Sequence, residues 1–265
     1  MALTIGGGPL SRRLADTRNF TVEGPAHSLL LQPFTRRVRA EVDGVTVLDT
    51  VRGALLHETG ILPQLYAPEE DFRLDLLEAT DTTTHCPFKG DASYRTLRVG
   101  DRTVVDAVWA YPEPLAGAPW LAGLAAMPMG AADRWFDEDT EVIGHLTDPY
   151  HRVDLRPTSR RVTVTAADGT VVADVDGAAD RVVLLAETGL VDRFYLPREA
   201  VKVPIEPSAT TTVCPYKGRA SYGSLRIGEQ ELTDALWSYE QPTDESRGVT
   251  GLVCLAHEGL TVTTT

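Results

Sequence analysis

Cysteine and lysine are both rare in this sequence, with three of each among 265 residues. Three cysteines, an odd number spread far apart, argue against a disulfide framework and favour a reducing compartment. No apolar run approaches the roughly 18 residues that a membrane-spanning helix needs. The N-terminal stretch also lacks the basic start and long apolar segment of a secretory signal. We therefore expect a cytoplasmic protein that does not enter a membrane.

The sequence also has no basic run, and its formal net charge is −13, from 38 acidic and 25 basic residues. Binding to nucleic acid depends mainly on lysine and arginine neutralising phosphates, so this balance argues against a nucleic-acid partner. The apolar fraction of 43% and the charged fraction of 24% are typical of a globular protein. Oligomeric state leaves no signal in the sequence.

The chain is an internal tandem repeat. With Cys86 aligned on Cys214, an ungapped offset of 128 runs through Pro114 and Pro242 and contains 15 identities in 29 positions. Upstream, LLHETGILPQLYAP (55–68) matches LLAETGLVDRFYLP (184–197). The acidic, proline-interrupted segment 136–152 is typical of a junction. We predict an N-terminal extension over residues 1–19, a first repeat domain over 20–140, and a second over 141–265 that includes a junction at 141–155.

Each copy has the pattern of a mainly β domain with little helix. Alternating apolar residues flank Asp43-Gly44 in the first copy and Asp168-Gly169 in the second, which predicts a hairpin in each. In TVVDAVWAY (103–111), period-two alternation predicts one face with Val105, Ala107, Trp109 and Tyr111. Segment 68–80 could begin a helix, but two internal prolines in its counterpart allow at most one shared turn.

The pentapeptide CPFKG (86–90) recurs as CPYKG (214–218), and it contains two of the three cysteines and two of the three lysines. Proline favours extended geometry at the preceding cysteine, and glycine allows a positive φ, so each copy predicts a strand end and a tight turn. A plain hairpin turn would leave the lysine in solvent. Because 22 of the 25 basic residues are arginine, we instead expect Lys89 and Lys217 to have a specific partner, either a buried carboxylate or a ligand anion.

Two pairs of carboxylates recur with the lysines. Glu58 and Glu187 end apolar runs, where a loop would carry them toward a pocket mouth. Asp106 and Asp234 lie mid-strand among apolar residues, where an unpaired charge is costly. We expect them to form structural ion pairs with arginines of the preceding strand, Arg98 and Arg226 respectively.

Aromatic side chains also recur at matching places, and they either line a ligand pocket or fill a core. They are Tyr94, Trp109 and Tyr111 in the first copy, and Tyr222, Trp237 and Tyr239 in the second.

Several chemistries lack the residues that they need. Zinc requires paired ligands at short spacing, and the sequence has no C-x-x-C pair, so we expect no metal site. No histidine has an evident counterpart in the other copy, which argues against a cysteine nucleophile at Cys86 or Cys214 with a histidine base. No glycine-rich phosphate or dinucleotide loop is present, so the sequence implies no cofactor.

Three motifs resemble the bacterial and fungal domain of unknown function 427: ETG followed by YLP (187–197), TTTHCPFKGDASY (82–94) and DAVWAYPEP (106–114). The resemblance extends over nearly the whole chain from about residue 20. It implies a β-tent fold in each copy, shared with methionine-R-sulfoxide reductases and the ligand domain of cereblon. Those relatives hold zinc through cysteine pairs that this chain lacks. A nucleotidyltransferase label sometimes attached to the family finds no matching Gly-Ser and paired-aspartate pattern here.

The leading hypothesis is one small-molecule pocket in each repeat. The lysine would hold an anionic or carbonyl group, the aromatics would form the apolar wall, and the glutamate would accept a hydrogen bond or proton. Two alternatives stay open. The cluster is either a structural network, in an interaction module whose function lies elsewhere, or the site of an enzyme with Lys or Glu as general base. The candidate ligand residues are Glu58, Lys89, Tyr94, Trp109 and Tyr111, with Glu187, Lys217, Tyr222, Trp237 and Tyr239; the candidate structural polar residues are Cys86, Arg98 and Asp106, with Cys214, Arg226 and Asp234.

Overall fold

The computed structural model describes residues 3–4, 8, 10–12, 19, 21 and 23–265, so most of the extension expected over residues 1–19 lies outside the described residues. The chain forms two compact units, Met1–Tyr150 and His151–Thr265. Both are mainly β, as the sequence predicts, and the helical segments of the described chain are short 3-10 turns. None of these turns is long or apolar enough to cross a membrane.

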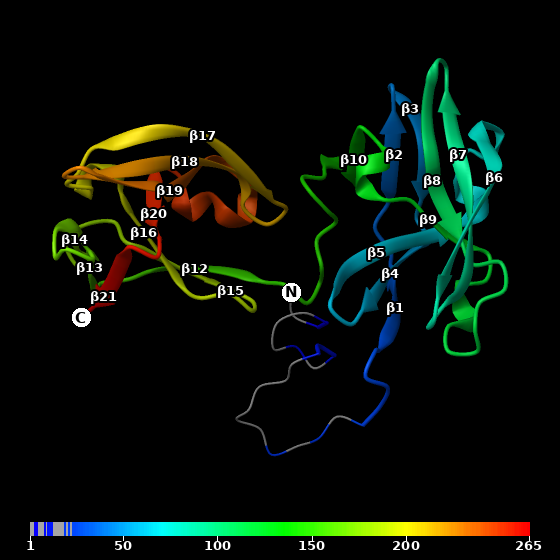
Figure 1. Cartoon of the computed structure of the whole chain (residues 1–265), viewed down its shortest axis with the longest axis horizontal. Helices are drawn as coiled ribbons and strands as arrows, with labels where there is room; N and C mark the ends of the chain where they lie inside the picture. The colour runs from blue at the N-terminus through cyan, green and yellow to red at the C-terminus, as the bar shows by residue number, and fades with distance from the viewer. Residues whose placement is uncertain (1–2, 5–7, 9, 13–18, 20, 22) are drawn as a thin grey trace. The chain divides into compact units, whose positions relative to one another are not determined.

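The first unit contains eleven strands within its described residues (Figure 1). They are β1 (Leu29–Phe34), β2 (Val38–Val42), β3 (Val45–Thr50), β4 (Gly53–Glu58), β5 (Ile61–Pro68), β6 (Leu77–Cys86), β7 (Gly90–Val99), β8 (Arg102–Ala110), β9 (Leu124–Ala126), β10 (Arg134–Asp137) and β11 (Thr140–Glu141). The 3-10 turns are η1 (Glu69–Asp71), η2 (Leu74–Leu76), η3 (Pro119–Leu121) and η4 (Met129–Ala131).

The second unit repeats this series. Its strands are β12 (Val153–Pro157), β13 (Arg161–Ala166), β14 (Val171–Asp176), β15 (Val183–Glu187), β16 (Arg193–Pro197), β17 (Ile205–Cys214), β18 (Gly218–Ile227), β19 (Gln230–Pro242), β20 (Leu252–Leu255) and β21 (Leu260–Thr264). Its 3-10 turns are η5 (Arg198–Ala200) and η6 (Asp244–Val249).

The two units have the same sheet topology. A seven-stranded antiparallel sheet has the order β1-β4-β5-β9-β8-β7-β6 in the first unit and β12-β15-β16-β20-β19-β18-β17 in the second. A smaller sheet accompanies each one, with the order β11-β10-β2-β3 and β14-β13-β21 respectively. The matching strand orders show that the sequence repeat is a repeat of the whole fold.

Each large sheet carries apolar side chains on both faces. In the first unit, Leu55, Leu65 and Ala125 pack with the smaller sheet, whereas the next residues, Leu56, Tyr66 and Ala126, belong to a second cluster. Successive side chains of a strand point to opposite faces. The second cluster, rich in aromatic residues, therefore lies on the face turned away from the smaller sheet.

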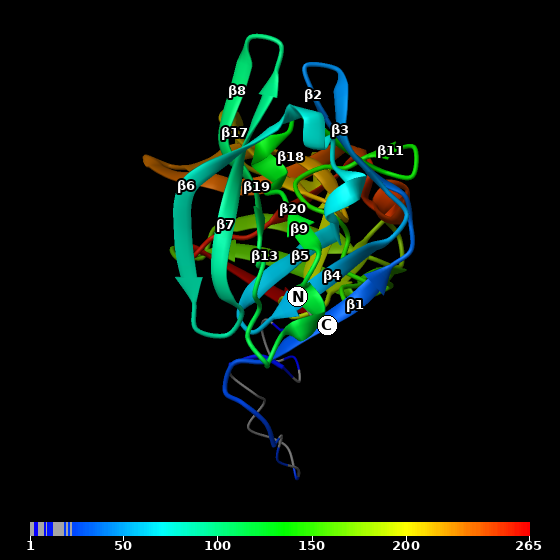
Figure 2. The same ribbon diagram turned by 90° about the vertical axis from the view of Figure 1, so that its right-hand side faces the viewer.

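The two predicted hairpins are confirmed. Strands β2 and β3 pair through Asp43 and Gly44, which have φ values of 48° and 75°, and β13 and β14 pair around Gly169. Figure 2 shows the tips of the β2–β3 and β7–β8 hairpins at one end of the first unit. Arg102 joins them there, since its Nη1 lies 3.1 Å from Oδ1 of Asp43.

Two local expectations need correction. Segment 68–80 forms no α-helix but the 3-10 turns η1 and η2, followed by strand β6; the single shared turn is η1, matched by η5. The even alternation expected across 103–111 is also wrong, because Asp106 has a φ of 52° and forms a bulge between β7 and β8. As a result Val105 is 71% exposed while Ala107 is buried in the core.

Candidate functional site

The pentapeptide forms the tight turn between β6 and β7, and its copy forms the turn between β17 and β18. The amide of Lys89 donates to the carbonyl of Cys86 at 3.3 Å, and that of Lys217 to Cys214 at 3.2 Å. The following glycine is required on two grounds. Gly218 has a φ of +104°, and a Cβ there would lie 2.9 Å from a backbone carbonyl. The turn holds each lysine at the base of its strand pair.

Each lysine points inward and pairs with a glutamate. Lys89 Nζ lies 2.5 Å from Glu58 Oε2, and Lys217 Nζ pairs in the same way with Glu187 Oε2. The lysine side chains are 12% and 11% exposed, and the glutamates 9% and 6%. Each glutamate is the last residue of its strand, β4 or β15. The lysines are therefore not in bulk solvent, and the nearest anionic partner is the glutamate of the ETG motif.

A histidine completes each cluster. His27 Nε2 lies 2.9 Å from Glu58 Oε1, and His151 Nε2 lies 3.0 Å from Glu187 Oε1. The expectation that no histidine has a counterpart in the other repeat is therefore wrong. We name the two sets, His27–Glu58–Lys89 and His151–Glu187–Lys217, the first and second triads.

The aromatic residue of the pentapeptide and the threonine of the ETG motif position the histidine. The ring of His27 stacks on Phe88 of CPFKG, with centroids 3.9 Å apart and planes 11° apart, and His151 stacks on Tyr216 at 4.0 Å and 29°. The residue after each histidine donates its amide to the threonine of ETG: Ser28 to Thr59, and Arg152 to Thr188, both at 2.9 Å. Both motifs therefore converge on one cluster.

Among the predicted aromatics, Tyr111 lies beside the lysine of the first triad. Lys89 Nζ lies 5.7 Å from the centroid of the Tyr111 ring. Tyr111 and Tyr239 are 6% and 5% exposed, and neither hydroxyl makes a hydrogen bond within the described residues. These phenols remain available as donors beside the ion pairs.

The other aromatics pack in the same cluster but have partners of their own. Trp109 Nε1 donates to the hydroxyl of Tyr66 at 3.2 Å, and Tyr94 shares a hydrogen bond with Thr84. The second repeat matches them, with Trp237 donating to Tyr195 and Tyr222 bonded to Thr212. Cys86 and Cys214 are half-buried free thiols at the strand ends.

The expected pairs between the mid-strand aspartates and arginines do not form. Arg98 pairs with Glu78 at 2.7 Å, and Arg226 pairs with Glu206 at 2.8 Å. The carboxylate of Asp106 instead accepts hydrogen bonds from the hydroxyls of Thr80 and Thr82. Asp234, with a φ of 53°, accepts one from Thr210. The bulge turns each aspartate toward β6 or β17, away from the arginine.

The surroundings of the triads shift the pKa values of two kinds of group. Burial would raise the pKa of Glu187, but the hydrogen bonds from His151 and Lys217 outweigh it, and the pKa is lowered from 4.5. Burial raises the pKa of the Tyr111 and Tyr239 phenols. At neutral pH the site thus holds an ionised glutamate beside a protonated phenol.

Because a carboxylate only accepts hydrogen bonds, the histidine must donate from Nε2. In a neutral histidine that tautomer leaves Nδ1 with a lone pair, as in sites where a carboxylate orients a general base. Lysine has three N–H donors and gives one to glutamate, so two remain. Among the described residues, no group of three His, Cys, Asp or Glu side chains is arranged to hold a metal ion.

The sequence held signals for the residues that the prediction missed. HSLLLQP (27–33) and HRVDLRP (151–157) share a histidine six residues before a proline, and an aromatic residue occupies the third place of both pentapeptides.

Fold and site together define a class of protein, a tandem of two antiparallel β domains that each bury a His–Glu–Lys triad. The family profile for the domain of unknown function DUF427 matches residues 30–138 and 154–265. The chain belongs to this family and contains two copies of its domain in tandem. A search of curated proteins found no match.

Proposed function

We propose that each repeat binds a small molecule at its triad, through an anionic or carbonyl group of that molecule. The supporting observation is a pair of unused donors in the same place in both repeats. Tyr111 and Tyr239 are 6% and 5% exposed, and their hydroxyls, which have no hydrogen-bond partner among the described residues, are not sealed from water. The Tyr111 ring lies 5.7 Å from Nζ of Lys89, and a lysine paired with one glutamate has two spare N–H groups.

A ligand oxygen placed between the two donors would satisfy both. Water can reach these hydroxyls, so the ligand oxygen would take the place of water there and add the roughly 0.5–1.5 kcal/mol net of an ordinary hydrogen bond. The ion pair also supports the proposal, because stability alone does not require it: apolar residues can often replace a buried ion pair without loss of stability. The aromatic cluster around Tyr111, which includes Trp109 and Tyr94, would supply the apolar wall.

A second candidate is a structural network in an interaction module. The observation that favours it is that both oxygens of Glu58 already have partners within the protein, His27 and Lys89. In this reading the triad fixes the positions of β1, β4 and the β6–β7 turn, and binds nothing.

A third candidate is an enzyme with a general base at the triad. The geometry does not favour Lys89 or Glu58 as that base, since each is engaged in the ion pair. His27 is the better candidate, because its Nε2 donates to Glu58 and its neutral form then has a lone pair on Nδ1.

We also propose that the repeats are separate β-tent domains over residues 20–140 and 141–265. The division of the chain into two compact units and the two matched family segments support separate domains. The large sheet folded against a smaller sheet in each unit supports the β-tent.

A thermal-shift screen against anionic and carbonyl metabolites separates binding from a structural role. We expect a ligand at 100 times its dissociation constant to add about 2.7 kcal/mol of stability, or several degrees of melting temperature. The double variant Tyr111→Phe with Tyr239→Phe removes only the unbonded hydroxyls, so it should melt like the wild type but lose the ligand shift.

The control is Lys202→Met, which removes the third lysine, an exposed residue. It should keep both the melting temperature and the ligand shift. A ligand shift that persists in the Tyr→Phe variant would contradict the proposal. A screen without any shift, with a large loss of stability in Lys89→Met, would favour the structural network.

A further inference from the structure

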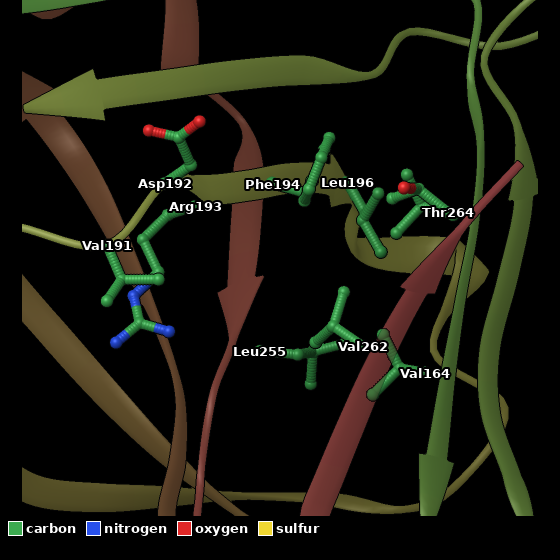
Figure 3. A pocket seen from close by; sticks show the side chains of 10 residues that line it. Val164, Val191, Asp192, Arg193, Phe194, Leu196, Leu255, Val262 and Thr264 are labelled. Atoms are coloured by element: carbon green, nitrogen blue, oxygen red, sulfur yellow. The ribbon is translucent and has the colours of Figure 1, made fainter. Parts of the chain in front are cut away.

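The second repeat contains a cavity that is lined mainly by apolar side chains. The cavity has a volume of about 230 Å³ and lies between β16 and the smaller sheet (Figure 3). Phe194 and Leu196 form one side, and Val164, Leu255 and Val262 form the other. These side chains pack on the sheet face that carries the smaller sheet, whereas Tyr239 belongs to the aromatic face. No residue of the second triad lines the cavity, although Arg193 at its edge also contacts Trp237 of the aromatic cluster.

One of the residues that line the cavity differs in size from its counterpart in the first repeat. Strand pairing places Trp135 opposite Ala40 in the first repeat and Val262 opposite Val164 in the second, and RRVRAEV aligns with RRVTVTA so that Ala40 and Val164 correspond. Trp135 is 4% exposed, whereas Val262 is 39% exposed. At this position the first repeat thus has a buried indole ring, and the second has a partly exposed valine.

A second exchange adds a charge to the cavity. Arg193 stands where the aligned first repeat has Gln64, whose amide donates to the carbonyls of Leu65 and Met127. The half-buried guanidinium of Arg193 makes no ion pair or hydrogen bond within the described residues. It lies over the face of Trp237, 5.9 Å from the ring centroid.

Arg193 also borders an adjoining hollow of about 470 Å³ lined by Trp237, His257 and Glu258. Figure 3 shows the Asp192 carboxylate pointing away from the Arg193 guanidinium, which leaves the cation without a carboxylate from its own neighbour. Asp192 and Glu258 nevertheless add negative charge nearby. They favour a ligand with a single negative charge over a phosphate dianion.

We propose that the second repeat binds a small aromatic carboxylate here, with its ring in the apolar cavity and its carboxylate on Arg193. The ring of the ligand would lie at the position that corresponds to the Trp135 indole of the first repeat. A group of one or two fused rings suits the cavity, whose volume of about 230 Å³ is just below the ~300–1,000 Å³ that is usual for ligand pockets. The planar guanidinium matches a carboxylate with two parallel hydrogen bonds. At the corresponding positions the first repeat has Trp135 in place of Val262 and Gln64 in place of Arg193, so we expect the site in the second repeat.

Isothermal titration calorimetry with benzoate, phenylacetate and indole-3-acetate tests the site, with indole-3-acetamide as the uncharged analogue. We expect saturable binding of at least one of the three acids. If indole-3-acetate binds, its affinity should be at least tenfold higher than that of indole-3-acetamide. The substitutions copy the first repeat. Arg193→Gln should weaken acid binding at least tenfold, and Val262→Trp should abolish it by filling the cavity.

The control Arg198→Gln removes the same charge from an exposed position of the same repeat and should bind like the wild type. Circular dichroism and thermal unfolding establish that each variant is folded, and Val262→Phe replaces Val262→Trp if the latter is not. The absence of saturable binding for all three acids would overturn the proposal. So would acid binding that survives either Arg193→Gln or the filled cavity.

Discussion

Replacing Lys217 with methionine leaves the carboxylate of Glu187, which is 6% exposed, without its cation. Removing one partner of a buried ion pair typically costs about 3–5 kcal/mol. The loss has a ceiling, because Glu187 can take up a proton instead. With an ordinary pKa of 4.5, protonation at pH 7 costs roughly 2.5 × 1.36, or about 3.4 kcal/mol. We therefore expect a loss of about 3 kcal/mol at pH 7.

The protonation of Glu187 also sets the pH dependence of this loss. In the wild type the pKa of Glu187 is lowered, so its contribution is present above 4.5 and is lost as the pH falls through the folded-state value. In Lys217→Met, burial raises this pKa, so the penalty is largest at neutral pH and disappears below about 4.5. The difference between the two proteins should shrink to about 1 kcal/mol near pH 4.

Pulsed hydrogen exchange with mass spectrometry across a urea series measures this difference for each repeat separately. Peptides from β17 and β18 should shift to lower urea, while peptides from β6 and β7 serve as an internal control. Lys202→Met should change stability by no more than about 0.5 kcal/mol. A loss below 1 kcal/mol at pH 7, or one that is equal at pH 7 and pH 4, would refute the reasoning.

Three further predictions concern the backbone and the thiols. Gly218→Ala should destabilise the second repeat by about 2 kcal/mol or more in urea unfolding, since φ is +104° and a Cβ would meet the carbonyl of Gln241 at 2.9 Å; equal stability would contradict the turn geometry. Asp234→Gly should be more stable than Asp234→Ala, because φ is 53° at this position, and the reverse order would rule out the bulge. Cys254 should resist iodoacetamide at pH 8 until the protein unfolds, because burial raises the pKa of its thiol to about 12; labelling of the native protein at this thiol, located by peptide mapping, would contradict its burial.

Patterns within one strand or turn predicted the fold well. The Asp43-Gly44 hairpin follows from residues that tolerate positive φ between two alternating runs, and the repeat follows from an ungapped segment. The bulge at Asp106 was not predicted, because the residues on both sides of the aspartate are apolar and the sequence pattern does not reveal its positive φ. The sequence of such a strand alternates regularly, although the side chains that follow the aspartate point to the opposite face from the one that the alternation predicts.

The candidate site was predicted in part. The lysine and glutamate could be found because each belongs to a motif that repeats at a nearly constant offset. The histidines could not be found in this way, because they lie 31 and 36 residues before Glu58 and Glu187, across hairpins of different length. The hydrogen bonds of Asp106 depend on the direction in which the bulge turns its side chain, and the sequence pattern does not predict that direction.

The most direct test of ligand binding uses the rarity of lysine, since protein labelled with ¹⁵Nζ-lysine has three side-chain signals. Lys89 and Lys217 should give protected signals that move saturably when a ligand from the anionic and carbonyl panel is added, while the exposed Lys202 stays unchanged. If the Lys89 and Lys217 signals stay fixed across the whole panel, or move only together with Lys202, the triads do not bind ligands of this class.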